Sequence, residues 1–272
     1  MTSASDWTTS DWPSRTLAVG DVDLVVHDSG GDGPAVLLLH GLAGHAFEWW
    51  PVASRLVRTH RVIAFDQRGH GGSTRRPGDV SRDAFVAEVL GVVEALDCAP
   101  VLLVGQSLGA HTALLTAAAR PDVVRGLVLV EGGVGGGGET ASAEATDWFR
   151  GWPLPFPDRP AAVEFFGGGV AGQAWAAGLA ETPDGLVPRF DVEVLQRAIL
   201  AVHAEERWAE WEAVEAPVLL VAAEHGPMVE EMRRMVAAQP HARLVEVAGA
   251  SHDVHLEAAD RIAEEIRGWA GA

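Results

Sequence analysis

The stretch VLLVGQSLGA at residues 101–110 decides the fold of this chain. Its apolar first half is typical of a buried strand. Its second half is the pattern G-x-S-x-G, after which an alanine-rich, helix-like segment runs up to Pro121. In this pattern a strand turns sharply into a helix, with the serine at the apex in a strained backbone conformation. The two glycines keep side chains out of the crowded turn, so the hydroxyl of Ser107 projects above the edge of a sheet. The stretch therefore predicts a nucleophilic serine.

Strand and helix patterns alternate around this stretch. Two segments of alternating polarity, Thr16–Val19 and Asp23–His27, predict strands joined by a tight turn. Continuous apolar runs, typical of parallel strands buried on both faces, lie at Ala35–Leu39, Arg61–Phe65, Val101–Val104, Leu127–Val130, Val218–Ala222 and Leu244–Val247. Helical patterns between them cover Phe47–Arg58, Arg82–Leu96, Leu108–Ala119, Val229–Gln239 and Val254–Ala270. This order predicts an α/β protein with an open, mostly parallel sheet and helices on both faces.

One segment interrupts the alternation, after the sixth predicted strand. Residues 132–138 are all glycine except Val134, which is the composition of a flexible hinge. Helical patches, prolines and many aromatic residues follow up to Trp211. We interpret residues 135–211 as a helical lid over the carboxyl edge of the sheet, and residues 15–134 and 212–272 as the core. Residues 1–14 are expected to be a flexible N-terminal segment. Alternatively, the aromatic residues form the core of an extra packing layer.

Composition limits the function classes. With 38 acidic and 20 basic residues the net charge is −18, which repels phosphate backbones and anionic lipids, so we expect no nucleic-acid partner and no membrane partner. The single cysteine, Cys98, excludes an internal disulfide and fits a small buried residue in a reducing compartment. The first residues have neither the basic nor the apolar region of a signal peptide. We therefore expect a cytoplasmic protein, of a size that suits one large domain; its oligomeric state stays open.

A serine nucleophile needs a base within hydrogen-bond reach. His252 follows the last predicted strand in a glycine-containing loop, and in an open α/β sheet that loop lies at the carboxyl edge, beside Ser107. His255, three residues later, is expected to be structural, and His40 to organise the neighbouring turn. The pair of histidines lacks further ligands at metal-binding spacing, so we expect no metal site and no cofactor.

Taken together, these motifs resemble the α/β-hydrolase fold family over nearly the whole chain. The matching segments are His40-Gly41-Leu42, Asp66-Gln67-Arg68-Gly69-His70-Gly71, the turn at Ser107, and the loop Gly249–His252. The resemblance implies an oxyanion hole made by the backbone N–H groups of Leu42 and Leu108. It also implies structural roles for Asp66 and Arg68.

The orienting acid departs from the usual family pattern. Most members of the family place an aspartate just after the seventh strand, where this chain has Gly226. A minority, which includes many haloalkane dehalogenases and the fungal zearalenone lactonases, carries the acid after the sixth strand. In this chain that position is Glu131, and both strand ends reach the same edge of the sheet. Glu131 is the predicted acid, with Glu224, Asp253 or the absence of any orienting acid as alternatives.

The reaction follows from these residues. In the family that this chain resembles, haloalkane dehalogenases and epoxide hydrolases use an aspartate as the nucleophile. This chain has Ser107 at that position, so the resemblance argues against both activities. This leaves acyl transfer through a serine ester. The aromatic-rich lid favours a hydrophobic ester or lactone, with Trp152, Phe156, Phe166 and Trp175 as candidate pocket residues. A C–C bond hydrolase or a lyase on the same scaffold stays open, as does a non-catalytic ligand receptor.

Overall fold

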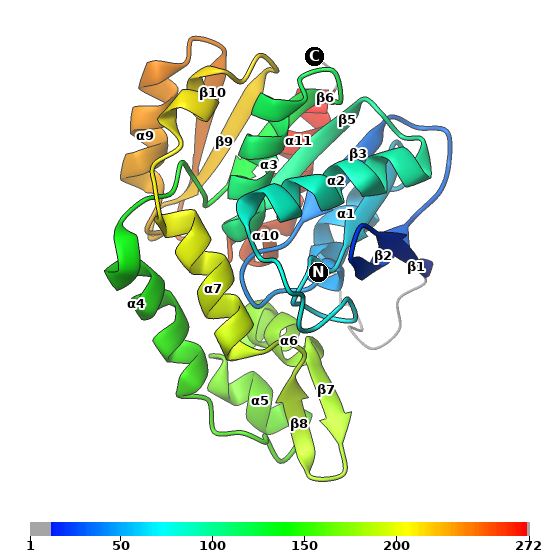
Figure 1. Ribbon diagram of the computed structural model, residues 1–272, viewed down its shortest axis with the longest axis vertical. Helices are drawn as coiled ribbons and strands as arrows, with labels where there is room; N and C mark the ends of the chain where they lie inside the picture. Colours follow the sequence, from blue (N-terminus) through cyan, green and yellow to red (C-terminus); the bar gives the residue numbers. More distant parts are fainter. Residues whose placement is uncertain (1–11, 271–272) are drawn as a thin grey trace.

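The computed structural model describes residues 12–270 (Figure 1). The predicted flexible segment 1–14 falls mainly on residues 1–11, which lie outside the described residues. The structure differs from that prediction at the end of the range, because Trp12 is buried and Ser14 already begins the first strand. Trp12 packs against Trp50 with ring centroids 5.6 Å apart, which fixes this part of the chain to the core.

The central sheet is mostly parallel, as predicted. Its strand order is β1-β2-β4-β3-β5-β6-β9-β10, with only the β1–β2 and β2–β4 pairs antiparallel. The strands are β1 (Ser14–Val19), β2 (Val22–Asp28), β3 (Ala35–Leu39), β4 (Arg61–Phe65), β5 (Val101–Gln106), β6 (Val124–Val130), β9 (Val218–Ala223) and β10 (Ala242–Val247). Strands β3, β5, β6 and β9 are buried on both faces, which is why their sequences are continuously apolar.

Helices cover both faces of the sheet (Figure 1). One apolar layer lies against α2 (Arg82–Leu96), α3 (Leu108–Ala119), α8 (Trp208–Glu212) and α9 (Val229–Ala238). The other lies against a 3₁₀ turn (Ala46–Trp49), α1 (Trp50–Leu56), α10 (Val254–Glu257) and α11 (Ala259–Ala270). The last two helices were predicted as one; the backbone leaves the helical conformation at Ala258, where φ is −126° and ψ is 41°. Of the helices in residues 12–270, none is long and apolar enough to cross a lipid bilayer.

The chain between β6 and β9 leaves the sheet and forms a separate layer, drawn green to yellow below the sheet in Figure 1. We call residues 135–207 the insertion. It holds α4 (Gly138–Arg150), α5 (Arg159–Phe165), α6 (Gly169–Ala177), the hairpin β7 (Leu179–Thr182) and β8 (Gly185–Pro188), and α7 (Val192–His203). The hairpin was not predicted. Helix α8, which the prediction divided between lid and core, packs with the core: Trp211 is fully buried there and donates a hydrogen bond to the carbonyl of Met235.

Candidate active site

Ser107 lies between β5 and α3 in a strained turn. Its φ of 51° and ψ of −114° are rare for a residue with a side chain. The backbone around it is held on both sides, since Ser107 N donates to Val130 O (3.0 Å) and His111 N donates to Ser107 O (3.1 Å). The serine is thus fixed at the carboxyl edge of the sheet and at the N-terminus of a helix.

The two glycines of the motif are required by contact. A Cβ on Gly105 would lie 2.2 Å from the carbonyl oxygen of Gly109, and a Cβ on Gly109 would lie 2.4 Å from the carbonyl oxygen of Leu39. Such distances exclude any side chain unless the backbone shifts. The turn is therefore tight because α3 approaches both β5 and the end of β3.

A cavity of about 510 Å³ opens above Ser107. Its floor consists of residues at the carboxyl edge of the sheet, and its roof of residues from α4, α6 and α7 of the insertion. Residues of the floor and walls include Leu42, Gln106, Ser107, Leu108, His111, Glu131, Met228, Glu231, His252 and Asp253, and those of the roof include Trp148, Phe149, Trp175, Ile199, Val202 and His203. The volume suits a small organic molecule. Ser107, His252, Glu131, Leu42 and Leu108, predicted from widely separated segments, all line this one cavity.

The carboxylate of Glu131 contacts His252. Glu131 directly follows β6, is fully buried, and has a left-handed backbone conformation with φ of 47°. One carboxylate oxygen accepts from Ala223 N (2.8 Å), and the other lies 3.2 Å from His252 Nδ1. Because an ionised carboxylate only accepts, the imidazole proton belongs on Nδ1. This leaves the lone pair of Nε2 free to act as a base.

Gly226 leaves the space that the carboxylate of Glu131 fills. A Cβ at position 226 would lie 2.2 Å from Glu131 Oε2 and 2.4 Å from Glu131 Cδ. An aspartate at position 226, the usual family arrangement, would collide with the carboxylate that is already there. Glu131 therefore occupies, from the neighbouring strand, the space that the more common acid would use.

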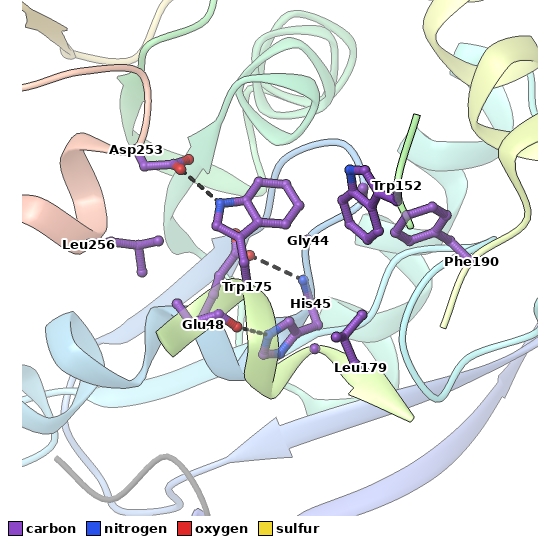
Figure 2. Close-up of a pocket in the computed structure, with 12 residues that line it drawn as sticks. Gly44, His45, Glu48, Trp152, Trp175, Leu179, Phe190, Asp253 and Leu256 are labelled. Carbon is purple, nitrogen blue, oxygen red and sulfur yellow. Dashed lines mark hydrogen bonds between the residues drawn. The ribbon is translucent and has the colours of Figure 1, made fainter. Parts of the chain in front are cut away.

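The two alternative acids have other partners. Glu224 is exposed and its carboxylate accepts from Gly249 N (2.8 Å). Asp253 accepts from the indole N–H of Trp175 on α6 (2.9 Å), as Figure 2 shows. The second contact ties the insertion to the residue next to His252. On the other side, the buried side chain of Gln106 donates to the carbonyl of His252 (3.1 Å). The loop of residues 249–253, which carries His252 and which we call the histidine loop, is thus held by three hydrogen bonds, to Glu224, Trp175 and Gln106.

The turn that carries Leu42 is organised by His40, as predicted. His40 is fully buried; its Nε2 accepts from Gln67 N (3.0 Å) and its Nδ1 donates to Gly41 O (2.7 Å). Both nitrogens are satisfied only in the neutral ring. Burial, with the neighbouring His70, accordingly lowers the pKa of His40 well below its usual value. Asp66 braces the same region by accepting from Ala46 N (2.7 Å).

The structure separates the four predicted pocket aromatics. Trp175 lines the main cavity, whereas Trp152 lines a neighbouring cavity of about 20 Å³, where Figure 2 shows it beside Phe190. Phe156 and Phe166 are not among the residues that line the main cavity. They pack within the insertion, where the ring centroids of Phe166 and Trp152 are 4.8 Å apart. Their positions fit the alternative interpretation, in which the aromatic residues form the core of an extra packing layer.

Residues that line the cavity but were not predicted include Glu48, Trp148, Phe149, Ile199, Val202, Met228, Glu231, His111 and His203. Most could not be found without the packing of α4 and α7 over the sheet. His111 is different, because it stands four residues after Ser107 on α3 and so projects from the same helix face. That spacing is a signal the sequence contains.

Comparison with known proteins identifies the class. A family model described as the Alpha/beta hydrolase family matches residues 36–265. The chain belongs to this family, which confirms the predicted resemblance and the predicted fold class.

Individual relatives are hydrolases of differing specificity. The chain is 32% identical over 131 residues to 2-(acetamidomethylene)succinate hydrolase of Mesorhizobium japonicum, a match that covers 48% of this chain and 47% of the relative. It is 40% identical over 100 residues to the sn-1-specific diacylglycerol lipase of Mus musculus, covering 36% of this chain and 32% of the relative. These matches span less than half of the length of either relative. The crystal structure of E-2-(acetamidomethylene)succinate hydrolase superposes with a TM-score of 0.86 at 25% identity, covering 96% of this chain and 100% of that one.

The neutral state of His40 predicts a pH dependence of stability. An unfolded His40 binds a proton below about pH 6.5, whereas the folded one resists it, so the free energy of unfolding should fall as the pH falls. Between pH 7.5 and 5.5 this one group should contribute a loss of about 1.4 kcal/mol. Urea unfolding at both pH values should show a correspondingly smaller loss for His40→Gln. An identical pH dependence of the two proteins would contradict this role.

The close contact between position 226 and Glu131 predicts that an aspartate at position 226, without a second change, destabilises the fold. Gly226→Asp should lower the free energy of unfolding by about 1–3 kcal/mol, because it overpacks the site and adds a second carboxylate beside Glu131. Gly78→Asp is the matched control, since a Cβ at that exposed position meets nothing within 4 Å. Thermal unfolding of both variants measures the difference. Equal stability of the two would show that the space at Gly226 is not filled.

Proposed function

We propose that this protein is a serine hydrolase that cleaves a neutral carboxylic ester or lactone through an acyl-enzyme on Ser107. The observation that carries the proposal is the contact of the buried Glu131 carboxylate with His252 Nδ1, beside a cavity that Ser107 also lines. A base oriented by a buried acid is what a weak hydroxyl nucleophile needs.

The proposed reaction has two halves. His252 Nε2 takes the proton of Ser107 Oγ as the oxygen attacks the carbonyl carbon, and the backbone N–H groups of Leu42 and Leu108 stabilise the resulting oxyanion. Collapse of the intermediate breaks the ester C–O bond, and the histidine returns the proton to the departing alcohol. Water, activated by the same histidine, then attacks the acyl-enzyme and releases the acid and the free serine. Glu131 stabilises the imidazolium that forms transiently in each half of the reaction.

The charges around the cavity favour a neutral substrate. Its described lining residues include four carboxylates, Glu48, Glu131, Glu231 and Asp253, but no arginine or lysine. The names of the Mesorhizobium relative and of the similar crystal structure both contain succinate. A succinate group carries carboxylates, and this cavity lining has no guanidinium group to pair with them. The proposal therefore favours an uncharged ester or lactone over such a diacid.

The composition of the chain and the lining of the cavity bear on its partners and location. We propose a hydrophobic small molecule as the partner because Trp148, Phe149 and Trp175 line the cavity, and the cytoplasm as the location because a single cysteine fits a reducing compartment. The acidic surplus supports the proposal that nucleic acid and membranes are not partners. A C–C bond hydrolase or a lyase on the same scaffold remains the competing activity, because it could use the same serine and histidine. A non-catalytic receptor is disfavoured by the orienting acid, which binding alone does not require.

Replacing the acid should cost most of the turnover. Glu131→Gln keeps the shape of the side chain but no longer holds the imidazole in the correct tautomer, so kcat should fall by about 10⁴-fold. The matched control is Glu224→Gln, which changes the alternative acid, and its kcat should stay within a few-fold of the wild type. Steady-state hydrolysis of p-nitrophenyl butyrate measures both. The reverse ranking would assign the acid to Glu224.

A substrate pair tests the charge argument. We expect p-nitrophenyl butyrate to be cleaved at least about tenfold more efficiently, in kcat/KM, than the mono-p-nitrophenyl ester of succinic acid, because the added carboxylate meets the acidic wall. A panel of γ- and δ-lactones is run alongside. A preference for the charged ester would overturn the neutral-substrate proposal, and no turnover on any ester or lactone would overturn the hydrolase itself.

A further inference from the structure

Arg82 is a buried cation that the proposed reaction does not use. It is the first residue of α2 and is 3% exposed. Its Nε and Nη1 atoms are buried and make no hydrogen bond to a described residue. The carboxylate that attracts it, Glu88, is already paired with Arg68 at 2.7 Å. Burial and the guanidinium of Arg207 lower the pKa of Arg82 to about 9, so it is still charged at neutral pH.

This position is unfavourable for a cation. The N-terminus of a helix carries a partial positive charge, which repels a cation in the first turn of α2. Taking the charge out of water without a carboxylate of its own destabilises the fold further. The ring of Phe85, whose centroid lies 4.5 Å from Arg82 Cζ, offsets part of that cost. A neutral side chain of similar length would suit the fold at least as well, which indicates that the charge serves the function.

The charge lies behind one of the proposed oxyanion donors. Arg82 Nη2 donates to the hydroxyl of Thr112 and lies 3.5 Å from the carbonyl oxygen of Leu108. The same hydroxyl donates to that carbonyl (3.0 Å). Because the backbone N–H of Leu108 is the proposed donor, one residue and one hydrogen bond separate this contact from the oxyanion. The guanidinium is therefore within about 10 Å of the oxyanion. Leu42, the second donor, packs against the same apolar cluster as Leu108.

From these contacts we propose that Arg82 supports the oxyanion hole: its buried positive charge stabilises the negative oxygen that forms beside Leu42 and Leu108. Glu131 has the corresponding role for the imidazolium of His252. Arg82 does not touch the substrate and transfers no proton, so it acts through its electrostatic field alone. Two unit charges about 10 Å apart, at an effective dielectric constant of about 20, change a rate roughly tenfold. This inference rests on the proposed hydrolase function and adds a residue to it.

Replacing Arg82 by methionine removes the charge and keeps most of the side chain. In Arg82→Met, kcat and kcat/KM for p-nitrophenyl butyrate should both fall about tenfold, because an oxyanion forms in each half of the reaction. The midpoint of thermal unfolding should stay the same or rise, because an unpaired buried charge is lost. Arg207→Met is the matched control: that guanidinium is paired with Glu205 (2.6 Å) and Glu210 (2.8 Å), and its loss should leave kcat within about twofold of the wild type.

An analogue that becomes an oxyanion gives a second measurement. When 1,1,1-trifluorooctan-2-one binds, Ser107 Oγ bonds to its carbonyl carbon, His252 takes the serine proton, and the carbonyl oxygen becomes negatively charged. Arg82→Met should bind this ketone about tenfold more weakly than the wild type does. Its affinity for octan-2-one, which stays an uncharged ketone, should not change.

Unchanged kcat and unchanged affinity for the fluorinated ketone in Arg82→Met would overturn the inference. A lower unfolding midpoint, with both ketones weakened equally, would also overturn it, because that result describes a structural role. If the wild type cleaves no ester and binds the fluorinated ketone no better than octan-2-one, it is the proposed function that fails.

Discussion

The carboxylate of Glu131 lies between the backbone N–H of Ala223 on one side and His252 Nδ1 on the other, fully buried beside the sheet. Much of the site depends on this placement. It selects the tautomer of His252, and it requires that position 226 have no side chain. It also requires an unusual left-handed backbone at the end of β6, which the bond from Glu131 N to Val221 O (3.0 Å) helps to hold.

Hydrogen bonds from several elements fix the residues around this contact. The histidine loop is held by Gln106 from below and by Trp175, through Asp253, from the insertion. The turn that carries Leu42 is held by the neutral ring of His40. Preorganised donors and a preorganised base need no rearrangement when charge develops, which is the main source of catalysis in sites of this kind. The insertion adds the roof and, through Trp175, one of these supports.

The sequence predicted the parts of the fold and site that follow local rules. The turn at Ser107 depends on close contacts of its own glycines, so the motif carries its geometry. The buried strands are visible as apolar runs because both of their faces are covered. Glu131 was predicted from the resemblance to family members whose acid follows the sixth strand, and from the glycine at position 226, where most members have an aspartate. The cavity wall did not follow, because Trp148 and His203 reach it only through the packing of α4 and α7. Phe156 and Phe166 are of the same residue type as Phe149, which lines the cavity, so the sequence cannot tell them apart. Only the packing shows that their rings contact each other, at a centroid distance of 5.4 Å.

The most direct test of the relocated acid is to move it back. In the double variant Glu131→Gly and Gly226→Asp, the space left by the first change admits the side chain added by the second, and glycine suits the left-handed backbone at position 131. The measurement is kcat for an ester substrate in both single variants and the double. Transfer of the acid between the two strands predicts that the double variant is at least about tenfold more active than the single variant Glu131→Gly. A double variant no better than Glu131→Gly alone would contradict the claim that the two positions serve one carboxylate site.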